Sequence, residues 1–105
     1  MARFDVYANS GAHASTTPYL LDIQSNLLDG LDSRMVIPLR RLDAFAKVKL
    51  PVRLTPVITV LGQDCLLETP KMGAVPKHVL KDLIASFSDD QARITAALDF
   101  LFQGY

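Results

Sequence analysis

The sequence predicts a mainly β domain of the α+β class, in which a small twisted antiparallel sheet or partly closed barrel packs against a C-terminal α-helix. Short apolar runs of β-prone residues alternate with turn residues along most of the chain. Pro51 and Pro56 exclude a long helix in the middle, and only 89–102 repeats apolar residues with helical spacing. Because the chain has 105 residues, 50% of them hydrophobic, we expect residues 1–105 to form one folded domain.

The first predicted element is a strand over Arg3–Tyr7, where apolar and polar residues alternate with period two. The stretch 9–18 is rich in Ser, Gly, Thr and Ala without periodicity, which is typical of a loop. His13 lies in this loop with no neighbouring carboxylate or cysteine, so we interpret it as a solvated side chain.

Two further strands are predicted over 19–24 and 33–39, antiparallel to each other and joined by the turn residues Asp29–Asp32. Pro38 has no N–H to donate to a ladder, so we expect it at a strand end, a bulge or a sheet edge. A single helical turn is predicted over 42–46.

The clearest hairpin pairs 57–61 with 65–69 around Gly62, which is free to adopt positive φ. Cys65 begins the second strand and is interpreted as a packing residue rather than a nucleophile. A further short segment over 78–83 precedes the terminal helix, which gives five or six strands in all.

The helix is predicted over Asp89–Phe102. Ser88 and Gln91 have the spacing of a capping box, and the two acidic residues in the first turn suit the helix dipole. These neighbouring carboxylates point about 100° apart, so they are poor candidates for paired catalytic acids. Gly104 is expected to end the helix. The apolar stripe consists of Ile94, Ala97, Leu98 and Leu101, widened by Phe100 and Phe102.

Eleven cations balance eleven anions, so the general attraction of a basic nucleic-acid-binding protein is absent. The segment Arg34–Arg53 nevertheless holds six cations and one anion, Asp43. These side chains are either solvated loop and edge-strand residues or a patch for an acidic partner. The cations are Arg34, Arg40, Arg41, Lys47, Lys49 and Arg53.

The sequence contains few signals of a catalytic or metal-binding site. A lone cysteine and two distant histidines predict no metal site, and the common catalytic motifs are missing. An acid–base pair could combine His13 or His78 with Asp64 or Glu68, but the spacing does not place them together. With no signal peptide and no long apolar run, we expect a cytoplasmic protein without membrane contact. A binding protein with an aromatic contact point at 100–105 is favoured.

Several segments resemble the CcdB toxins of plasmid and chromosomal toxin–antitoxin modules. They are Leu21–Asp29 (LDIQSNLLD), Arg34–Leu39 (RMVIPL), Phe4–Tyr7 (FDVY), Met72–Pro76 (MGAVP) and Phe102–Tyr105 (FQGY). The resemblance implies a homodimer with an SH3-like barrel, a long C-terminal helix, no cofactor and no enzymatic activity. It also implies that Gln24, Arg34 and 36–38 hold the barrel and dimer together or contact a target.

The function that the resemblance implies is poisoning of a topoisomerase. Proteins of this family bind the DNA gyrase A subunit and trap gyrase on cleaved DNA. A cognate CcdA-like antitoxin wraps the toxin with a disordered segment, and the two proteins together bind their own promoter DNA, which regulates transcription of the module. The role of such modules on plasmids is plasmid maintenance.

Carried over by position, the implied gyrase contacts fall in two segments. They are Ser25, Leu27 and Leu28 after the second strand, and Asp99, Gln103, Gly104 and Tyr105 at the C-terminal end. Better-known members have tryptophan where this chain has Gln103, and that ring stacks on an arginine of gyrase. Leu27 and Leu28 are expected on opposite faces of an extended segment, one in the core and one facing a partner.

Two other functions stay open. One is an endoribonuclease of the MazF/Kid type, for which Arg34–Arg53 would be the phosphate-binding surface. The other is a non-toxic CcdB-like interaction module that keeps only the antitoxin-binding surface, which the change at Gln103 leaves possible.

Overall fold

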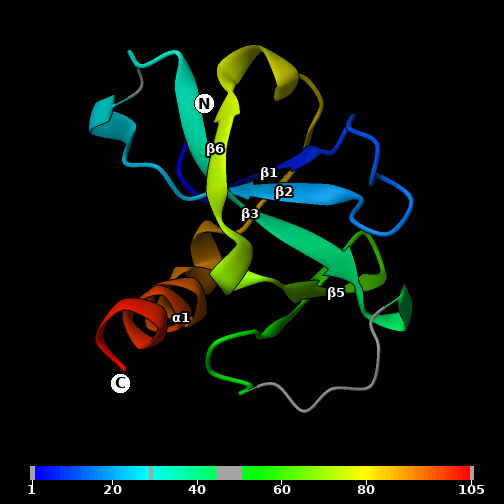
Figure 1. The fold of residues 1–105 in the computed structure, drawn as a ribbon, viewed down its shortest axis with the longest axis vertical. Helices are drawn as coiled ribbons and strands as arrows, with labels where there is room; N and C mark the ends of the chain where they lie inside the picture. Colours follow the sequence, from blue (N-terminus) through cyan, green and yellow to red (C-terminus); the bar gives the residue numbers. More distant parts are fainter. Residues whose placement is uncertain (1, 29, 45–50, 105) are drawn as a thin grey trace.

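The computed structural model describes residues 2–28, 30–44 and 51–104, which form one curled antiparallel sheet with a C-terminal helix against it (Figure 1). The predicted mainly β, α+β half-barrel is therefore confirmed. In these residues the strands are β1 (Asp5–Ala8), β2 (Tyr19–Asp22), β3 (Ser33–Arg41), β4 (Val57–Val60), β5 (Gln63–Leu67), β6 (Gly73–Pro76) and β7 (Leu83–Ser86), and the helix is α1 (Gln91–Gln103).

The long strand β3 organises the sheet. The strand order is β4-β5-β3-β2-β1-β7, and β6 also pairs with β3. One side of β3 pairs with β2, while the other side pairs first with β6 over 33–36 and then with β5 over 39–41. Because β3 pairs with β6 in its first half and with β5 in its second half, it belongs to two parts of the sheet. This arrangement allows the sheet to curl into a half-barrel (Figure 1).

Pro38 lies inside β3, an interior strand whose register with β2 is regular over 36–39, so the expectation of a strand end, a bulge or a sheet edge is wrong. It pairs with Leu20 of β2, and its carbonyl oxygen accepts a hydrogen bond of 3.0 Å from the Glu68 N–H. In an antiparallel strand the N and O of one residue point to the same side. The missing N–H of Pro38 therefore faces the gap between β6 and β5, where no ladder bond is required.

The core lies mainly between the concave face of the sheet and α1. Alternate residues of the strands point into it, and Ile94 and Ala97 of α1 are fully buried against them. A second, smaller cluster on the opposite face contains Tyr7, Leu20 and Leu80. The centre of the sheet is thus covered on both faces, which explains why neighbouring residues such as Leu20 and Leu21 are both buried.

The first strand and the hairpin of β4 and β5 differ from their predicted bounds because of residues with positive φ. β1 begins at Asp5, because Phe4 has a φ of 71°, which an extended strand cannot contain. The hairpin predicted over 57–61 and 65–69 is confirmed, with its strands at Val57–Val60 and Gln63–Leu67. Leu61 and Gly62, with φ of 49° and 80°, form a two-residue turn of the type favoured between twisted strands.

Two strands were not predicted. β6 pairs with the first half of β3, and β7 forms the sheet edge beside β1. The predicted 78–83 segment spans a 3-10 turn at Lys77–Val79 and the first residue of β7. The predicted turn at 42–46 is a 3-10 turn over Leu42–Ala44, and its remaining residues lie outside those described.

The terminal helix is confirmed, but its predicted cap is wrong. Ser88–Asp90 form a 3-10 turn, α1 begins at Gln91, and no side-chain hydrogen bond caps either element. Gly104 ends the helix as expected, with φ of 81° and its N–H 3.0 Å from the Phe100 carbonyl oxygen. No helix in the described part of the chain is long and apolar enough to cross a membrane.

Candidate functional site

The first candidate segment follows β2 and is held in place by polar side chains. Gln24 donates through Nε2 to the carbonyl oxygens of Leu28 (3.1 Å) and Ser33 (3.2 Å). Its Oε1 accepts the Met35 N–H at 3.0 Å. Asn26 accepts the Arg3 N–H at 2.7 Å. The Gln24 side chain therefore closes the loop between β2 and β3, which is a structural role.

The leucines of this segment are presented to solvent. Asn26–Leu28 form a 3-10 turn rather than an extended strand, and the Ser25 Oγ accepts the Leu27 N–H at 3.2 Å. Leu27 is 94% exposed and Leu28 is 49% exposed. The expectation that one leucine enters the core is therefore wrong, because a tight turn directs both side chains away from the sheet.

The second candidate segment is the end of α1. Asp99 and Gln103 are exposed and lie one helical turn apart, so they share a face. Phe102 is 71% exposed, whereas Leu98 and Leu101 are half-buried, and Leu98 packs against the core. Gly104 is also exposed, and Tyr105 lies outside the described residues.

Contacts with the sheet side of the molecule fix the direction of α1. Arg93 donates from Nη2 to the carbonyl oxygen of Val57, the first residue of β4, at 2.6 Å. Further along, the Arg53 guanidinium lies 5.1 Å from the centroid of the Phe100 ring. Such a cation–π contact joins the loop before β4 to the last turns of the helix.

The structure does not bring the two candidate segments together within one chain. In Figure 1 the turn after β2 lies at the upper left, while the end of α1 lies at the lower left of the molecule. A partner that contacts both segments must therefore span one side of the molecule or contact two copies of the chain.

The basic segment is dispersed rather than gathered into one surface. Arg34 is fully buried, so it is neither a solvated loop residue nor part of a patch. Arg41 pairs with Asp43 at 3.3 Å, Arg53 contacts Phe100, and Arg40 faces the cavity described next. Lys47 and Lys49 lie outside the described residues.

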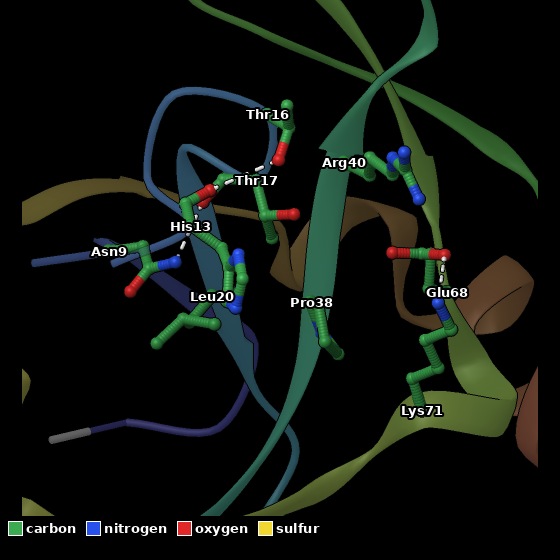
Figure 2. A pocket seen from close by; sticks show the side chains of 9 residues that line it. All are labelled: Asn9, His13, Thr16, Thr17, Leu20, Pro38, Arg40, Glu68 and Lys71. Carbon is green, nitrogen blue, oxygen red and sulfur yellow. Dashed lines mark hydrogen bonds and ion pairs between the residues drawn. The ribbon is translucent and has the colours of Figure 1, made fainter. Parts of the chain in front are cut away.

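The sequence did not indicate a pocket of about 420 Å³ that the structure contains. Figure 2 shows the side chains that line it. Its residues come from the 9–18 loop, from β2 and β3, and from the turn after β5. His13 and Glu68, which spacing alone did not connect, both line it, whereas His78 lies with Asp32 and Lys77 elsewhere. The lining residues are Asn9, His13, Thr16, Thr17, Leu20, Pro38, Arg40, Glu68 and Lys71.

The lone cysteine is unsuited to nucleophilic chemistry. Cys65 is fully buried in the core, and burial, with a smaller contribution from Asp64, raises the pKa of its thiol to about 11. At neutral pH the thiol is therefore protonated. Among residues 2–28, 30–44 and 51–104, no cluster of three or more His, Cys, Asp or Glu side chains could hold a metal ion.

A curled antiparallel sheet with one C-terminal helix is also the fold of a solved protein described as "Endoribonuclease in complex with its cognate antitoxin from Mycobacterial species". The two structures have a TM-score of 0.71 and 12% sequence identity, over 94% of this chain and 91% of the mycobacterial one. At this identity the likeness shows that the two chains share a fold. The sequence model of the CcdB family, described as "CcdB protein", matches residues 3–104. This chain therefore belongs to the CcdB family of toxins.

Proposed function

We propose that this protein binds the A subunit of DNA gyrase and traps the complex of gyrase with cleaved DNA. Membership of the CcdB family over residues 3–104 is the observation that carries the proposal. The exposed face of Asp99 and Gln103, together with Phe102, supplies the contact surface at the end of α1. The Asp99 carboxylate offers an acceptor for a cation, and the Phe102 ring offers apolar area.

A second contact is proposed at Ser25, Leu27 and Leu28. Leu27 is almost wholly exposed and Leu28 is half-exposed, so the two neighbouring side chains offer apolar surface that a partner could cover. Its turn is held by Gln24, so the leucine is presented without a large entropic cost on binding.

The working form is proposed to be a homodimer. A chain of this size exposes Leu27, Leu83 and Phe102 to solvent as a monomer, and a second copy would add another set of both candidate segments. Light scattering at micromolar concentration should give twice 11.6 kDa. A monomer mass alone would contradict the dimer.

We also propose that the protein binds a cognate CcdA-like antitoxin. Promoter DNA is bound only by the complex of the two proteins. The gyrase target places the working protein in the cytoplasm. The neighbouring reading frame tests the pairing: a short upstream gene should encode a basic DNA-binding start and an acidic tail prone to disorder.

The deciding experiment removes Gln103–Tyr105 and measures binding to purified gyrase A subunit. We expect strongly weakened binding with an unchanged fold, because these residues follow the last contacts of α1 with the core. Gln103→Trp should strengthen binding and gyrase-dependent DNA cleavage by supplying a ring at the tip. Gln91→Trp, at the other end of the same helix, is the matched control and should change neither.

Full affinity after truncation would place the contact on another surface. The same purified protein, incubated with RNA in the absence of gyrase, separates the poison from the endoribonuclease alternative. RNA cleavage would favour the latter. A protein that binds its antitoxin but neither gyrase nor RNA would be the non-toxic interaction module.

A further inference from the structure

A short turn before β1 contacts the Asn26–Leu28 turn. The Asp5 N–H donates to the Ala2 carbonyl oxygen at 3.1 Å, which closes a turn over residues 2–5. Within this turn, the Arg3 N–H donates to the Asn26 Oδ1 at 2.7 Å. The two residues are 23 positions apart, so this hydrogen bond joins segments that are distant in the chain.

Arg3 is itself held firmly against the sheet. Its Nε donates to the Ile23 carbonyl oxygen at 3.0 Å, and its guanidinium carbon lies 4.7 Å from the centroid of the Phe4 ring. Phe4 is only 5% exposed. The Phe4 N–H donates to the Asp22 carbonyl oxygen at 2.6 Å, and its own carbonyl oxygen accepts the Phe87 N–H at 2.8 Å. The Arg3 N–H is therefore a donor whose place is fixed by the end of β2 and by the residue after β7.

Asn26 connects this fixed donor to the turn that presents Leu27. The other bonds of the turn are local, because the Ser25 Oγ accepts the Leu27 N–H at 3.2 Å and the Ser25 carbonyl oxygen accepts the Leu28 N–H at 3.0 Å. Such bonds move with the turn. Gln24 ties the Leu28 end of the turn to β3, and Asn26 ties its first residue to the segment before β1. The leucine side chains have little packing of their own to fix their direction.

We propose that Asn26 is a positioning residue for binding to gyrase A subunit. Through the Arg3 N–H it holds the turn in the conformation in which Leu27 meets the partner, and it acts through Leu27 rather than by its own contact. This inference rests on the proposed function. A turn without this bond samples other directions, and the apparent affinity falls in proportion to the fraction of molecules that keep the competent one.

The test is a calorimetric titration of the full chain with purified gyrase A subunit. Asn26→Ala should weaken binding by about three- to fivefold, with an unchanged midpoint of urea unfolding, because an exposed hydrogen bond contributes little to global stability. Asn26→Asp keeps an oxygen that accepts the Arg3 N–H, so it should restore the affinity to within about twofold.

The matched control is Asn9→Ala. The Asn9 Oδ1 also accepts a backbone N–H, that of Gly11 at 2.9 Å, but it does so in the 9–18 loop. This loop lies at the right of the molecule in Figure 1, away from the Asn26–Leu28 turn at the upper left. Asn9→Ala should therefore leave the affinity for gyrase A subunit unchanged.

Two further measurements separate positioning from direct contact. In a Leu27→Asn background, Asn26→Ala should weaken binding by less than about 1.5-fold, because the side chain that it positions is gone. In the free protein, the Leu28 amide should exchange its hydrogen faster in Asn26→Ala and at the wild-type rate in Asn26→Asp. The Leu21 amide, within β2, should exchange at the wild-type rate in both.

The results distinguish this inference from the proposed function. Binding by the wild type with undiminished affinity in Asn26→Ala, with unchanged exchange at Leu28, or with equal losses in Asn26→Ala and Asn26→Asp, would overturn the inference and leave the proposed function in place. An undiminished effect of Asn26→Ala in the Leu27→Asn background would make Asn26 a direct contact instead. A wild type that does not bind gyrase A subunit would overturn the proposed function and, with it, this role of Asn26.

Discussion

Arg34 and Asp22 form an ion pair in which both side chains are completely buried, with 2.6 Å between Nη2 and Oδ2. The Arg34 Nε donates to the same carboxylate oxygen at 2.9 Å, and the Asp22 Oδ1 accepts the Gln24 N–H at 3.0 Å. Burial raises the pKa of Asp22, while the Arg34 guanidinium opposes that rise. The pair joins the end of β2 to the start of β3, the two strands between which the Asn26–Leu28 turn lies.

We predict that Arg34→Leu destabilises the fold by about 3–5 kcal/mol, because it leaves the Asp22 carboxylate buried without its cation. Urea unfolding measures the change. The double variant Asp22→Leu with Arg34→Leu should be closer to the wild type than either single variant, since it leaves no buried charge. Additive losses in the double variant would contradict a coupled pair.

Stability should fall at high pH because of Cys65. Its pKa is raised from 9.0 to about 11 in the folded protein, so the unfolded chain ionises first as the pH rises. The contribution of the neutral thiol to the free energy of unfolding is complete below pH 9. It is lost between about pH 9 and 11, and the total loss is roughly 3 kcal/mol. Urea unfolding across this range should show a steeper loss for the wild type than for Cys65→Ala. Parallel curves would refute the assignment.

The hairpin turn offers a stabilising change. Leu61 has a φ of 49° and is 75% exposed, so it is strained without contributing much packing. We expect Leu61→Asn to raise stability by about 0.5–1 kcal/mol, because asparagine tolerates the left-handed region and favours this type of turn. Thermal unfolding measures it. Gly62→Ala should lower stability instead, because Gly62 also has a positive φ, which alanine adopts only with strain.

Ser88 should be nearly neutral for stability. The capping box predicted from the sequence would have made Ser88→Ala cost about 0.5–2 kcal/mol. Since no side-chain hydrogen bond caps the 3-10 turn or α1, we expect a change within about 0.5 kcal/mol. A loss of about 1 kcal/mol or more in chemical unfolding would show that the cap forms in solution.

A substitution at Leu27, in the Asn26–Leu28 turn, should weaken binding to the partner without changing the fold. Leu27→Asn removes an apolar side chain that has almost no contact with the rest of the chain, so its unfolding free energy should stay within about 0.5 kcal/mol of the wild type. Under the proposed function it should weaken binding to gyrase A subunit by about tenfold, as expected for a buried apolar contact. Leu83→Asn, on the β7 edge, is the control for a general loss of exposed apolar surface.

The elements that the sequence predicted well are those with local signals. The hairpin predicted over 57–61 and 65–69 has apolar, β-prone runs on both sides of Gly62, and α1 has a helical stripe of apolar residues with Gly104 after it. Both signals act within a few residues, so neither requires knowledge of distant neighbours. Asp99 and Gln103 are singled out by the resemblance to the CcdB toxins, and the helical spacing explains only why the two exposed side chains share a face of α1.

What only the tertiary structure decided involves residues that are far apart in the chain. β6 is a strand because the first half of β3 supplies its hydrogen bonds, and its own residues, GAVP, give little β signal. His13 and Glu68 share a cavity because β3 carries the 9–18 loop and the turn after β5 to its two sides. Sequence determined the local elements through backbone preference and apolar spacing, whereas long-range strand pairing decided which charges are buried and which side chains meet.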